Sequence, residues 1–364
     1  MKIVSVVGTR PNFMKLAPVA REFVRRADVE HIIVHTGQHY DAAMSDTFFA
    51  DLDIPEPRYH LAVGDDAPAV QIGVIMTRLD PILERERPDV MMVYGDVSST
   101  VAAALCASKR SIRLAHVEAG LRSRDRTMPE ELNRLVTDQL ADILYAPSPD
   151  AVDNLRAEGI PSARIHFVGN VMIDALLATL PRARGADYPG RLGLGSVPYV
   201  IATLHRPANV DDPGRLRELV GALEELSREV AVLLPLHPRT RRRMRELGIV
   251  PNGGGALHVL EPLSYLEMLG LMASARLVVT DSGGLQEETT FLGVPCLTVR
   301  PNTERPITLE RGTNRLVAPE RRAIVDGART AINAARCATP AAIERWDGLA
   351  AQRMVSVLCD GQRY

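Results

Sequence analysis

The chain has 364 residues, of which 46% are hydrophobic and 24% are charged, and its formal net charge is -2. This length suggests about two domains that each bury a core, and the composition is typical of a globular protein rather than a disordered one. The near-neutral charge gives no indication of nucleic-acid binding, and no apolar run approaches the roughly 18 residues of a membrane span.

Strands and helices are predicted to alternate along the first half of the chain. The first residues are too short for a signal peptide and predict a strand over residues 3–7. A turn with Arg10 and Pro11 then opens a helix over about residues 13–26, because proline suits a first helical turn. Further strands are predicted over residues 31–36, 89–94, 112–117 and 143–146, and helices around Met44, Phe48 and Phe49, over 65–87, over 98–109 and from 130. This alternation predicts a parallel, doubly wound sheet.

Charged side chains follow several of these predicted strands. Arg10 and Lys15 follow the first strand, Asp96 and Glu118 follow two later ones, and Glu130 opens a helix. An open α/β sheet binds ligands at the carboxyl ends of its strands. Carboxylates held near one another raise one another's pKa, so that one can act as an acid while another acts as a base. Taken singly, each residue also fits a helix cap, an ion-pair partner or a solvated cation.

The pattern restarts after residues 181–198, a stretch rich in Gly, Pro and Arg that we interpret as the link between two domains. We expect domains over residues 1–180 and 181–364, and we allow for the last helices to pack back on the first domain. Domains of this kind usually face each other across a cleft. Strands are predicted over residues 199–204, 230–236, 257–260, 275–280 and 294–299, with helices after about residue 321.

The segment over residues 281–288 reads Asp-Ser-Gly-Gly-Leu-Gln-Glu-Glu and lies between a predicted strand and a predicted helix. Free N–H groups at such a helix N-terminus hold phosphate, and two glycines let a diphosphate approach the backbone. Ser282 can donate a hydroxyl, and Glu288 can accept from ribose hydroxyls. The segment also fits an ordinary capped turn. No GxGxxG, EF-hand, HExxH or Walker A string is present, so neither NAD nor a metal is indicated.

The four cysteines Cys106, Cys296, Cys337 and Cys359 are widely spaced and include no CxxC pair. We therefore expect free thiols and a cytoplasmic protein. Cys296 lies inside a predicted strand, where packing in the core is its expected role.

Taken together, the motifs resemble those of the non-hydrolysing UDP-N-acetylglucosamine 2-epimerases over nearly the whole chain. They are Gly8–Pro11 with Lys15, Thr36–His39, Gly95-Asp96, His116–Arg122, Pro129–Glu131 with Asn133-Arg134, His205-Arg206, Asp281–Glu288 and Thr303–Pro306. The resemblance implies a GT-B-like fold of two Rossmann-like domains with the active site between them. It also implies a homodimer, a UDP-sugar substrate, and neither metal nor NAD.

The resemblance further implies a reaction and its residues. The C1–O bond breaks and the C2 proton is removed, which gives enzyme-bound 2-acetamidoglucal and UDP; UDP then adds back while a proton reaches the other face of C2. Asp96, Glu118 and Glu130 would be the acid/base carboxylates, without an assignment of each to a face, and His205 would assist the leaving group. The phosphates or the leaving group would be bound by Arg10, Lys15, Ser282, Gly283, Gly284 and Arg305. Glu288 would hold the ribose, Leu263 to Met268 would lie near the uracil, and Arg134 would be a further substrate-binding residue.

Three departures from the family pattern qualify this expectation. Ala208 replaces an acidic residue, and Gly64–Pro68 replaces an Arg-Gln pair that holds a second, activating UDP-N-acetylglucosamine. Acidic side chains there repel a diphosphate, so we expect allosteric activation to be weak or absent. The loop 123–128 also differs, which leaves the sugar less defined than the reaction. Alternatives are a hydrolysing variant, a 2-epimerase of a related UDP-acetamido sugar, a GT-B glycosyltransferase and a nucleotide-sugar binder.

Overall fold

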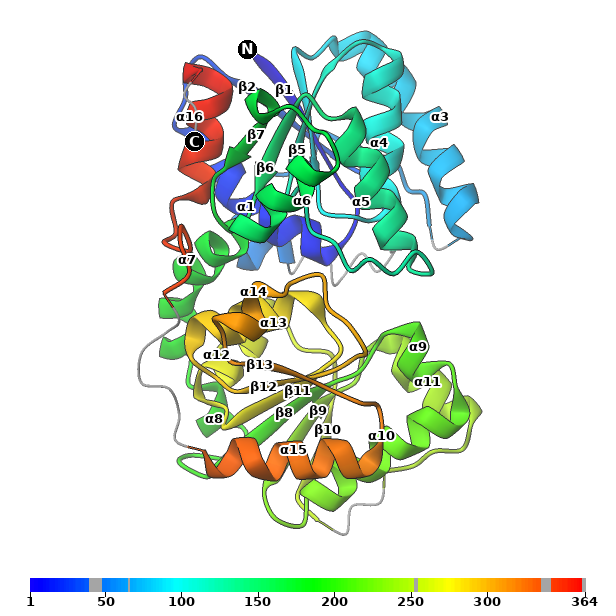
Figure 1. The fold of residues 1–364 in the computed structure, drawn as a ribbon, viewed down its shortest axis with the longest axis vertical. Coiled ribbons are helices and arrows are strands. Elements are labelled where there is room, and N and C mark those ends of the chain that lie inside the picture. Colours follow the sequence, from blue (N-terminus) through cyan, green and yellow to red (C-terminus); the bar gives the residue numbers. More distant parts are fainter. Residues whose placement is uncertain (39–47, 65, 252–254, 335–341, 362–364) are drawn as a thin grey trace. The chain divides into compact units, whose positions relative to one another are not determined.

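The computed structural model describes residues 1–38, 48–64, 66–251, 255–334 and 342–361 (Figure 1). The chain divides into two compact units: unit 1 comprises Met1–Leu177 and Glu344–Tyr364, and unit 2 comprises Ala178–Ile343. Met44, Cys337, Asp65 and His39, which the sequence interpretation mentions, lie outside the described residues.

Unit 1 contains a seven-stranded parallel sheet in the order β3-β2-β1-β4-β5-β6-β7. The strands are β1 Lys2–Val7, β2 Glu30–His35, β3 Tyr59–His60, β4 Val90–Tyr94, β5 Arg113–Val117, β6 Ile143–Ala146 and β7 Ile165–Phe167. The helices are α1 Arg10–Val24, α3 Pro68–Glu86, α4 Ser98–Lys109, α5 Pro129–Leu140, α6 Pro149–Ala157 and α16 Ala350–Asp360, with the 3₁₀ turn η1 Ser162–Arg164. The chain runs from β1 to β2 and β3 on one side and resumes with β4 on the other. The carboxyl ends of β1 and β4 therefore form a switch point, where open α/β sheets bind ligands.

The sheet of unit 1 is covered on both faces. Alternate strand residues such as Val4, Val6 and Ile32 join buried residues of α3, α4 and α6 in one hydrophobic core. Helices α1 and α16 pack beside each other, so the C-terminal helix belongs to unit 1 (Figure 1). Burial on both faces explains why these strands are continuously apolar rather than alternating.

Unit 2 contains a six-stranded parallel sheet in the order β10-β9-β8-β11-β12-β13, with its switch point between β8 and β11. The strands are β8 Tyr199–Thr203, β9 Ala231–Pro235, β10 Leu257–Leu260, β11 Leu277–Thr280, β12 Cys296–Val299 and β13 Asn314–Val317. The helices are α8 Tyr188–Arg191, α9 Pro207–Val210, α10 Pro213–Leu226, α11 Pro238–Glu246, α12 Tyr265–Ser274, α13 Gly283–Leu292, α14 Ile307–Glu310 and α15 Arg321–Asn333. Buried residues of α10 and α15 form the core with one face of this sheet.

The expected α/β class with two parallel, doubly wound sheets is confirmed, but three short strands, β3, β7 and β13, were not predicted. Residues 181–198, which we interpreted as the link between two domains, are helical in part. Helix α7 runs over Val171–Gly185 across the boundary between the units, and α8 follows it. Ala183 is buried, and Ala183 and Tyr188 both pack against Gly270 of α12. Tertiary packing thus accompanies helical structure in the first part of this Pro- and Gly-rich stretch.

Two further features bear on function. No helix in the described part of the chain combines the length and apolar composition that a membrane crossing needs. Cys106, Cys296 and Cys359, the cysteines within the described segments, are free thiols.

Candidate active site

A buried ion pair lies at the carboxyl ends of β1 and β5. Lys15 Nζ, on α1, lies 2.8 Å from Glu118 Oε2, and each side chain is only 5% exposed. Glu118 follows β5 directly and has a φ of 74°, in the left-handed region that residues other than glycine rarely adopt. Such a conformation persists only where the surroundings hold it, and it is frequent at functional sites. The sequence placed both residues at strand ends, and the structure brings them into contact.

The turn after β4 lies against this pair. Gly95 has a φ of 63°, and a Cβ atom there would lie 3.1 Å from Lys15 Nζ and 3.3 Å from Glu118 Oε2. Asn12 Nδ2, from the start of α1, donates to the Tyr94 carbonyl at 2.7 Å. The close approach therefore requires glycine at position 95. Asp96 directly follows this glycine in the chain, so its backbone lies near the ion pair.

Asp96 is held by α5. The Arg134 guanidinium contacts Asp96 Oδ2, and Asn133 Nδ2 donates to the Asp96 carbonyl at 2.8 Å. Arg134 Nη2 also lies 2.7 Å from Glu131 Oε2, so this side chain, 2% exposed, binds two carboxylates. The Asp96 side chain keeps 24% of its surface exposed, which leaves it accessible to a ligand.

Glu131 in turn holds the loop that precedes α5. Its two oxygens accept from the Ser123 and Arg124 backbone N–H groups, each at 2.9 Å. Burial raises the pKa of Glu131, but the Ser123 N–H and the Arg134 guanidinium together lower it below its ordinary value. The loop 123–128 is thereby tied through Arg134 to Asp96.

The other two expected residues of unit 1 lie at helix starts. Glu130 is half-buried in the first turn of α5, and it forms no hydrogen bond or ion pair with the residues that the structure describes. Arg10 opens α1, with its guanidinium 5.1 Å from the Phe48 ring centre, a cation–π contact. Unit 1 therefore brings Lys15, Glu118, Asp96 and Arg134 into one network and leaves Glu130 outside it.

In unit 2, Asp281 connects the ends of β8 and β11. This fully buried carboxylate lies 2.8 Å from His205 Nδ1 and accepts from the Arg206 N–H at 2.9 Å and the Asn209 amide at 3.1 Å. Burial raises the pKa of Asp281, but His205 and the backbone donors outweigh it and hold the pKa at about 2. The His205 side chain is 37% exposed. Asp281 thus fixes the ring of a histidine that a ligand can reach.

The N-terminus of α13 lies against a cluster of arginines. Ser282 occupies the N-cap position, but its side chain makes no capping hydrogen bond. A Cβ atom at Gly283 would lie 2.5 Å from Arg305 Nη1, which itself lies 2.5 Å from Glu304 Oε1. Arg300 Nη2 lies 2.7 Å from Glu304 Oε2. Gly284, partly exposed, completes the first turn. Free N–H groups and guanidinium groups together are suited to bind an anion such as phosphate.

Glu288 is a buried carboxyl on the same helix. Tyr265 OH donates to Glu288 Oε1 at 2.9 Å. Burial raises the pKa of Glu288 to about 8, with Tyr265 opposing this and Glu287 adding to it, so the carboxyl holds a proton at neutral pH. Leu263 and Met268 are partly exposed beside and within the start of α12.

The sequence interpretation gave no site role to several side chains that organise these sites, although three of them lie in the motifs quoted above. Asp281, Glu131, His116 and Asp138 are buried and bridge elements far apart in the chain. The spacing of Glu131, Arg134 and Asp138 on one helix was a usable signal, because residues three and seven apart share a helix face. Among the described residues, no group of three or more His, Cys, Asp or Glu side chains is arranged to hold a metal ion.

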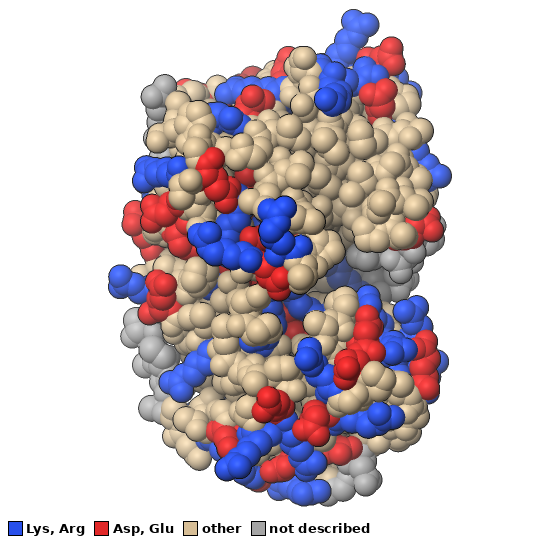
Figure 2. All heavy atoms as spheres, turned by 45° about the vertical axis from the view of Figure 1, so that its right-hand side comes forward, with Lys and Arg blue, Asp and Glu red and all other residues tan. Residues whose placement is uncertain are grey.

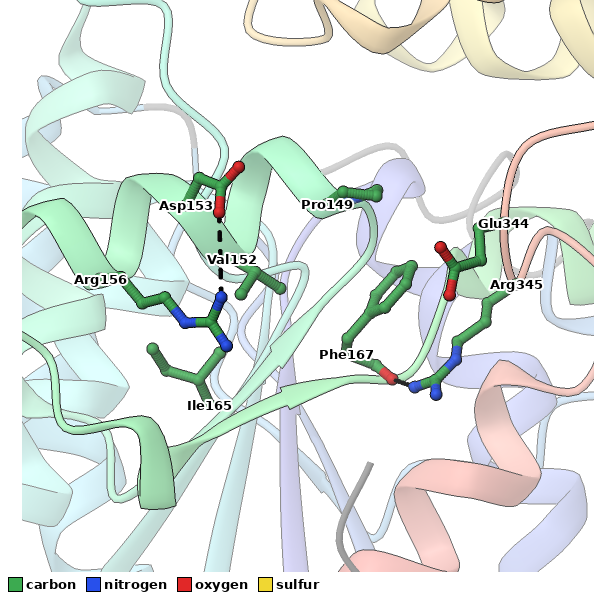
Figure 3. A pocket seen from close by; sticks show the side chains of 8 residues that line it. All are labelled: Pro149, Val152, Asp153, Arg156, Ile165, Phe167, Glu344 and Arg345. Atoms are coloured by element: carbon green, nitrogen blue, oxygen red, sulfur yellow. Dashed lines mark hydrogen bonds and ion pairs between the residues drawn. The ribbon is translucent and has the colours of Figure 1, made fainter.

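A shallow groove of about 280 Å³ lies elsewhere on unit 1, along the edge strand β7 (Figure 3). It contains none of the expected site residues and is lined by Pro149, Val152, Asp153, Arg156, Ile165, Phe167, Glu344 and Arg345. Arg345 donates to the Phe167 carbonyl and lies 4.7 Å from its ring centre. The groove is therefore not part of the candidate site.

Two Rossmann-like units with parallel sheets, one with carboxylates at its strand ends and the other with a helix N-terminus suited to an anion, define the class of GT-B-like proteins. The family model of UDP-N-acetylglucosamine 2-epimerase matches residues 21–359, and the chain belongs to this family. It is 38% identical over 375 residues to the UDP-N-acetylglucosamine 2-epimerase of Methanocaldococcus jannaschii, covering 100% of both chains. It is 44% identical over 336 residues to the UDP-2,3-diacetamido-2,3-dideoxy-D-glucuronate 2-epimerase of Pseudomonas aeruginosa, covering 91% of this chain and 92% of the relative.

The fold comparison agrees with the sequence comparison. The crystal structure of the Methanocaldococcus jannaschii UDP-GlcNAc 2-epimerase in complex with UDP-GlcNAc and UDP superimposes with a TM-score of 0.91 at 38% identity, covering 99% of this chain and 100% of that one. The Neisseria meningitidis UDP-GlcNAc 2-epimerase bound to UDP-GlcNAc gives a TM-score of 0.89 at 30% identity, with the same coverage. The family recognised from the motifs is confirmed.

Proposed function

We propose that this protein is a non-hydrolysing UDP-N-acetylglucosamine 2-epimerase that interconverts UDP-N-acetylglucosamine and UDP-N-acetylmannosamine. The observation that carries the proposal is the network of unit 1, in which Glu118 pairs with Lys15 while Asp96 pairs with Arg134 beside the same glycine turn. Epimerisation at C2 requires groups that remove a proton and return one, and fixed carboxylates serve both purposes.

In this proposal, unit 1 acts on the sugar. Asp96, Glu118 and Glu130 supply the acid and base groups at C2, and Lys15 and Arg134 fix two of these carboxylates. The elimination breaks the C1–O and C2–H bonds: the electron pair of the C1–O bond leaves with UDP, a carboxylate takes the C2 proton, and the C2–H electron pair forms the C1=C2 bond. In the re-addition UDP bonds to C1 again, and a proton is delivered to the opposite face of C2. No oxidation occurs, so the reaction consumes no redox cofactor.

Unit 2 holds UDP in this proposal. Ser282, Gly283, Gly284 and Arg305 bind the phosphates at the N-terminus of α13, where the helix dipole and a guanidinium favour negative charge. His205, fixed by Asp281, assists the departing diphosphate, and Arg10 is a further candidate ligand of the phosphates. Glu288 holds the ribose, and Leu263 and Met268 lie near the uracil.

Proton NMR of UDP-N-acetylglucosamine with the protein in D₂O tests the proposal. We expect UDP-N-acetylmannosamine to appear and deuterium to enter C2 of both sugars. Accumulation of free N-acetylmannosamine and UDP would instead establish a hydrolysing enzyme. An unchanged spectrum would refute activity on this substrate, and adding sugar acceptors would then test for a glycosyltransferase.

A second candidate substrate is a UDP-diacetamido uronic acid. It is favoured by the 44% identity to the Pseudomonas aeruginosa enzyme and by Arg124 and Arg126, exposed cations in the loop 123–128 that suit a sugar carboxylate. Arg124 also has a φ of 59°, and Glu131 fixes its backbone N–H. Comparing kcat/KM for the two UDP-sugars decides between the substrates.

We further propose a cytoplasmic homodimer. Figure 2 shows few charged side chains on the side of unit 1 where α3, α4 and α5 lie in Figure 1. Exposed apolar residues there include Val70, Leu132 and Val136, with exposed fractions of 51%, 39% and 41%. Such a face is suited to association.

Light scattering should give twice the monomer mass for the wild-type protein, and Val136→Glu should give monomers. A monomeric wild-type protein would refute this proposal. Cell fractionation tests the location.

A further inference from the structure

Helix α5 carries a stripe of buried charges on its inner face. Glu131, Arg134 and Asp138 lie three and seven residues apart, and their exposed fractions are 2%, 2% and 0%. Removing such charges from water costs several kcal/mol each unless they are paired. Glu131 and Arg134 pair with each other and hold Asp96, as described above. The role of Asp138 is not explained by these contacts.

Asp138 accepts three hydrogen bonds. Its Oδ1 lies 2.6 Å from His116 Nδ1, and its Oδ2 lies 2.7 Å from Arg122 Nη2 and 3.1 Å from the Gly120 backbone nitrogen. Burial raises the pKa of Asp138, but His116 and Arg122 lower it below its ordinary value. Asp138 is therefore an ionised carboxylate whose acceptor sites are occupied by donors.

These contacts determine how His116 is oriented. His116 Nε2 lies 2.8 Å from the Gly95 carbonyl, which only accepts, so Nε2 donates. Nδ1 lies against the carboxylate of Asp138. Arg122 also binds Glu158 through two hydrogen bonds, of 2.7 Å and 2.6 Å, so its guanidinium lies between two carboxylates. The His116 ring is thus fixed at both of its nitrogens.

The Asp138–His116 network ends at two backbone groups, the Gly95 carbonyl and the Gly120 N–H. Each belongs to a turn that carries a candidate catalytic residue. Gly95, whose carbonyl His116 binds, precedes Asp96 and lies against the Lys15–Glu118 pair. Gly120, whose N–H Asp138 binds, lies two residues after Glu118. One carboxylate on α5 thus holds both turns, one directly and one through the His116 ring.

We propose that Asp138 is a positioning residue for the chemistry at C2, which through His116 and Gly120 keeps Asp96 and Glu118 in their reactive arrangement. This inference rests on the proposed function. A misplacement of about 1 Å in a reacting group can reduce a rate by roughly 100-fold, so the network need move only slightly to affect turnover. Most of the residues proposed to bind UDP lie in unit 2, outside this network, so the Kd for UDP is not expected to change.

The test is the variant Asp138→Asn, assayed by epimerisation and by UDP titration. Asparagine cannot accept from all three donors, so we expect kcat to fall about 10-fold to 100-fold, with KM and the Kd for UDP unchanged. The matched control is Asp142→Asn. Asp142 Oδ2 accepts from the Leu114 N–H at 2.8 Å, near the other end of β5, so its loss should leave kcat unchanged.

A double-mutant cycle with His116→Asn tests whether the two side chains act together. If Asp138 acts through His116, the double variant should be no slower than Asp138→Asn alone, whereas independent effects would multiply. Two results would overturn the inference: effects of the two substitutions that multiply, or a kcat for Asp138→Asn equal to that of Asp142→Asn. Neither result would affect the proposed function, which depends on epimerisation by the wild-type protein. A wild-type protein that epimerises no UDP-sugar would overturn both. If Asp138→Asn does not fold, His116→Asn provides the test. It should show the same fall in kcat with an unchanged Kd for UDP.

Discussion

Replacing Gly283 with alanine should weaken UDP binding through a defined steric conflict. The new Cβ atom would lie 2.5 Å from Arg305 Nη1 and 2.6 Å from Glu304 Oε1. Neither group can move freely, because Arg305 and Glu304 are 6% and 2% exposed and Arg305 Nε lies 3.0 Å from Glu287 Oε2. Overpacking of such a site costs roughly 1–3 kcal/mol. Breaking a buried ion pair costs about 3–5 kcal/mol, which sets the upper limit.

We therefore expect Gly283→Ala to lower the free energy of unfolding by about 1–3 kcal/mol. Displacing Arg305 from the turn should also weaken UDP binding. We expect the Kd for UDP to rise about tenfold or more, which corresponds to a loss of about 1.4 kcal/mol in binding free energy. Urea unfolding and calorimetric titration with UDP measure these effects.

The control is Gly73→Ala in α3, where no atom lies within 4 Å of the added Cβ. It should be neutral or stabilise the helix by up to about 1 kcal/mol. If Gly283→Ala binds UDP as the wild-type protein does and unfolds like the control, the close packing of this turn against Arg305 is not needed for binding.

Four further outcomes follow from the site. Glu118→Gln should reduce turnover roughly 10²–10⁴-fold while UDP affinity is retained; unchanged turnover would show that Glu118 is not an acid/base group. The pKa of Glu288 is raised from 4.5 to about 8, so its carboxyl destabilises the fold increasingly as the pH rises through this window. Urea unfolding should thus show that the free energy of unfolding of Glu288→Gln, relative to that of wild type, is higher at pH 8 than at pH 5. If the difference between variant and wild type is the same at both pH values, this prediction is wrong. Asp281, whose pKa is lowered from 3.8 to about 2, stabilises the fold above pH 3.8 and loses this effect as the pH falls towards 2. Asp281→Asn should therefore cost roughly 3–5 kcal/mol at pH 7, and about 2 kcal/mol less at pH 2, as judged by unfolding at both pH values. Because the exposed Asp66 repels a diphosphate, the rate should depend hyperbolically on UDP-N-acetylglucosamine, and a sigmoidal curve would contradict the expected lack of activation.

The two halves of the molecule differ in how far local patterns predicted their sites. The turn before α13 was singled out from Ser282, Gly283 and Gly284 alone, because glycines after an apolar strand let a ligand approach the backbone. Arg300 and Arg305 come from the segment after β12, which also carries Glu304, and only packing brings this segment against Gly283. Asp281 was noted only as the start of this motif, although it fixes His205.

Helix α5 illustrates the same limit in unit 1. Glu130 and Glu131 are adjacent and chemically alike, yet Glu131 is buried against Arg134 while Glu130 is half-exposed. Successive helical residues point about 100° apart, so the rotation of the helix on its neighbours decides which carboxylate is buried. The spacing of Glu131, Arg134 and Asp138 places them on one face of the helix, but it does not specify that this face is the buried one.

The order of strands and helices, the parallel sheets and the strand ends that carry charge follow from the sequence itself, since hydrophobic periodicity, prolines and glycines act over a few residues. The partners of those charges do not. Lys15 meets Glu118, Asp96 meets Arg134 and His116 meets Asp138 only after the strands have taken their order in the sheet. A buried charge is tolerated only where a distant partner compensates it, and the tertiary structure decides which partner that is.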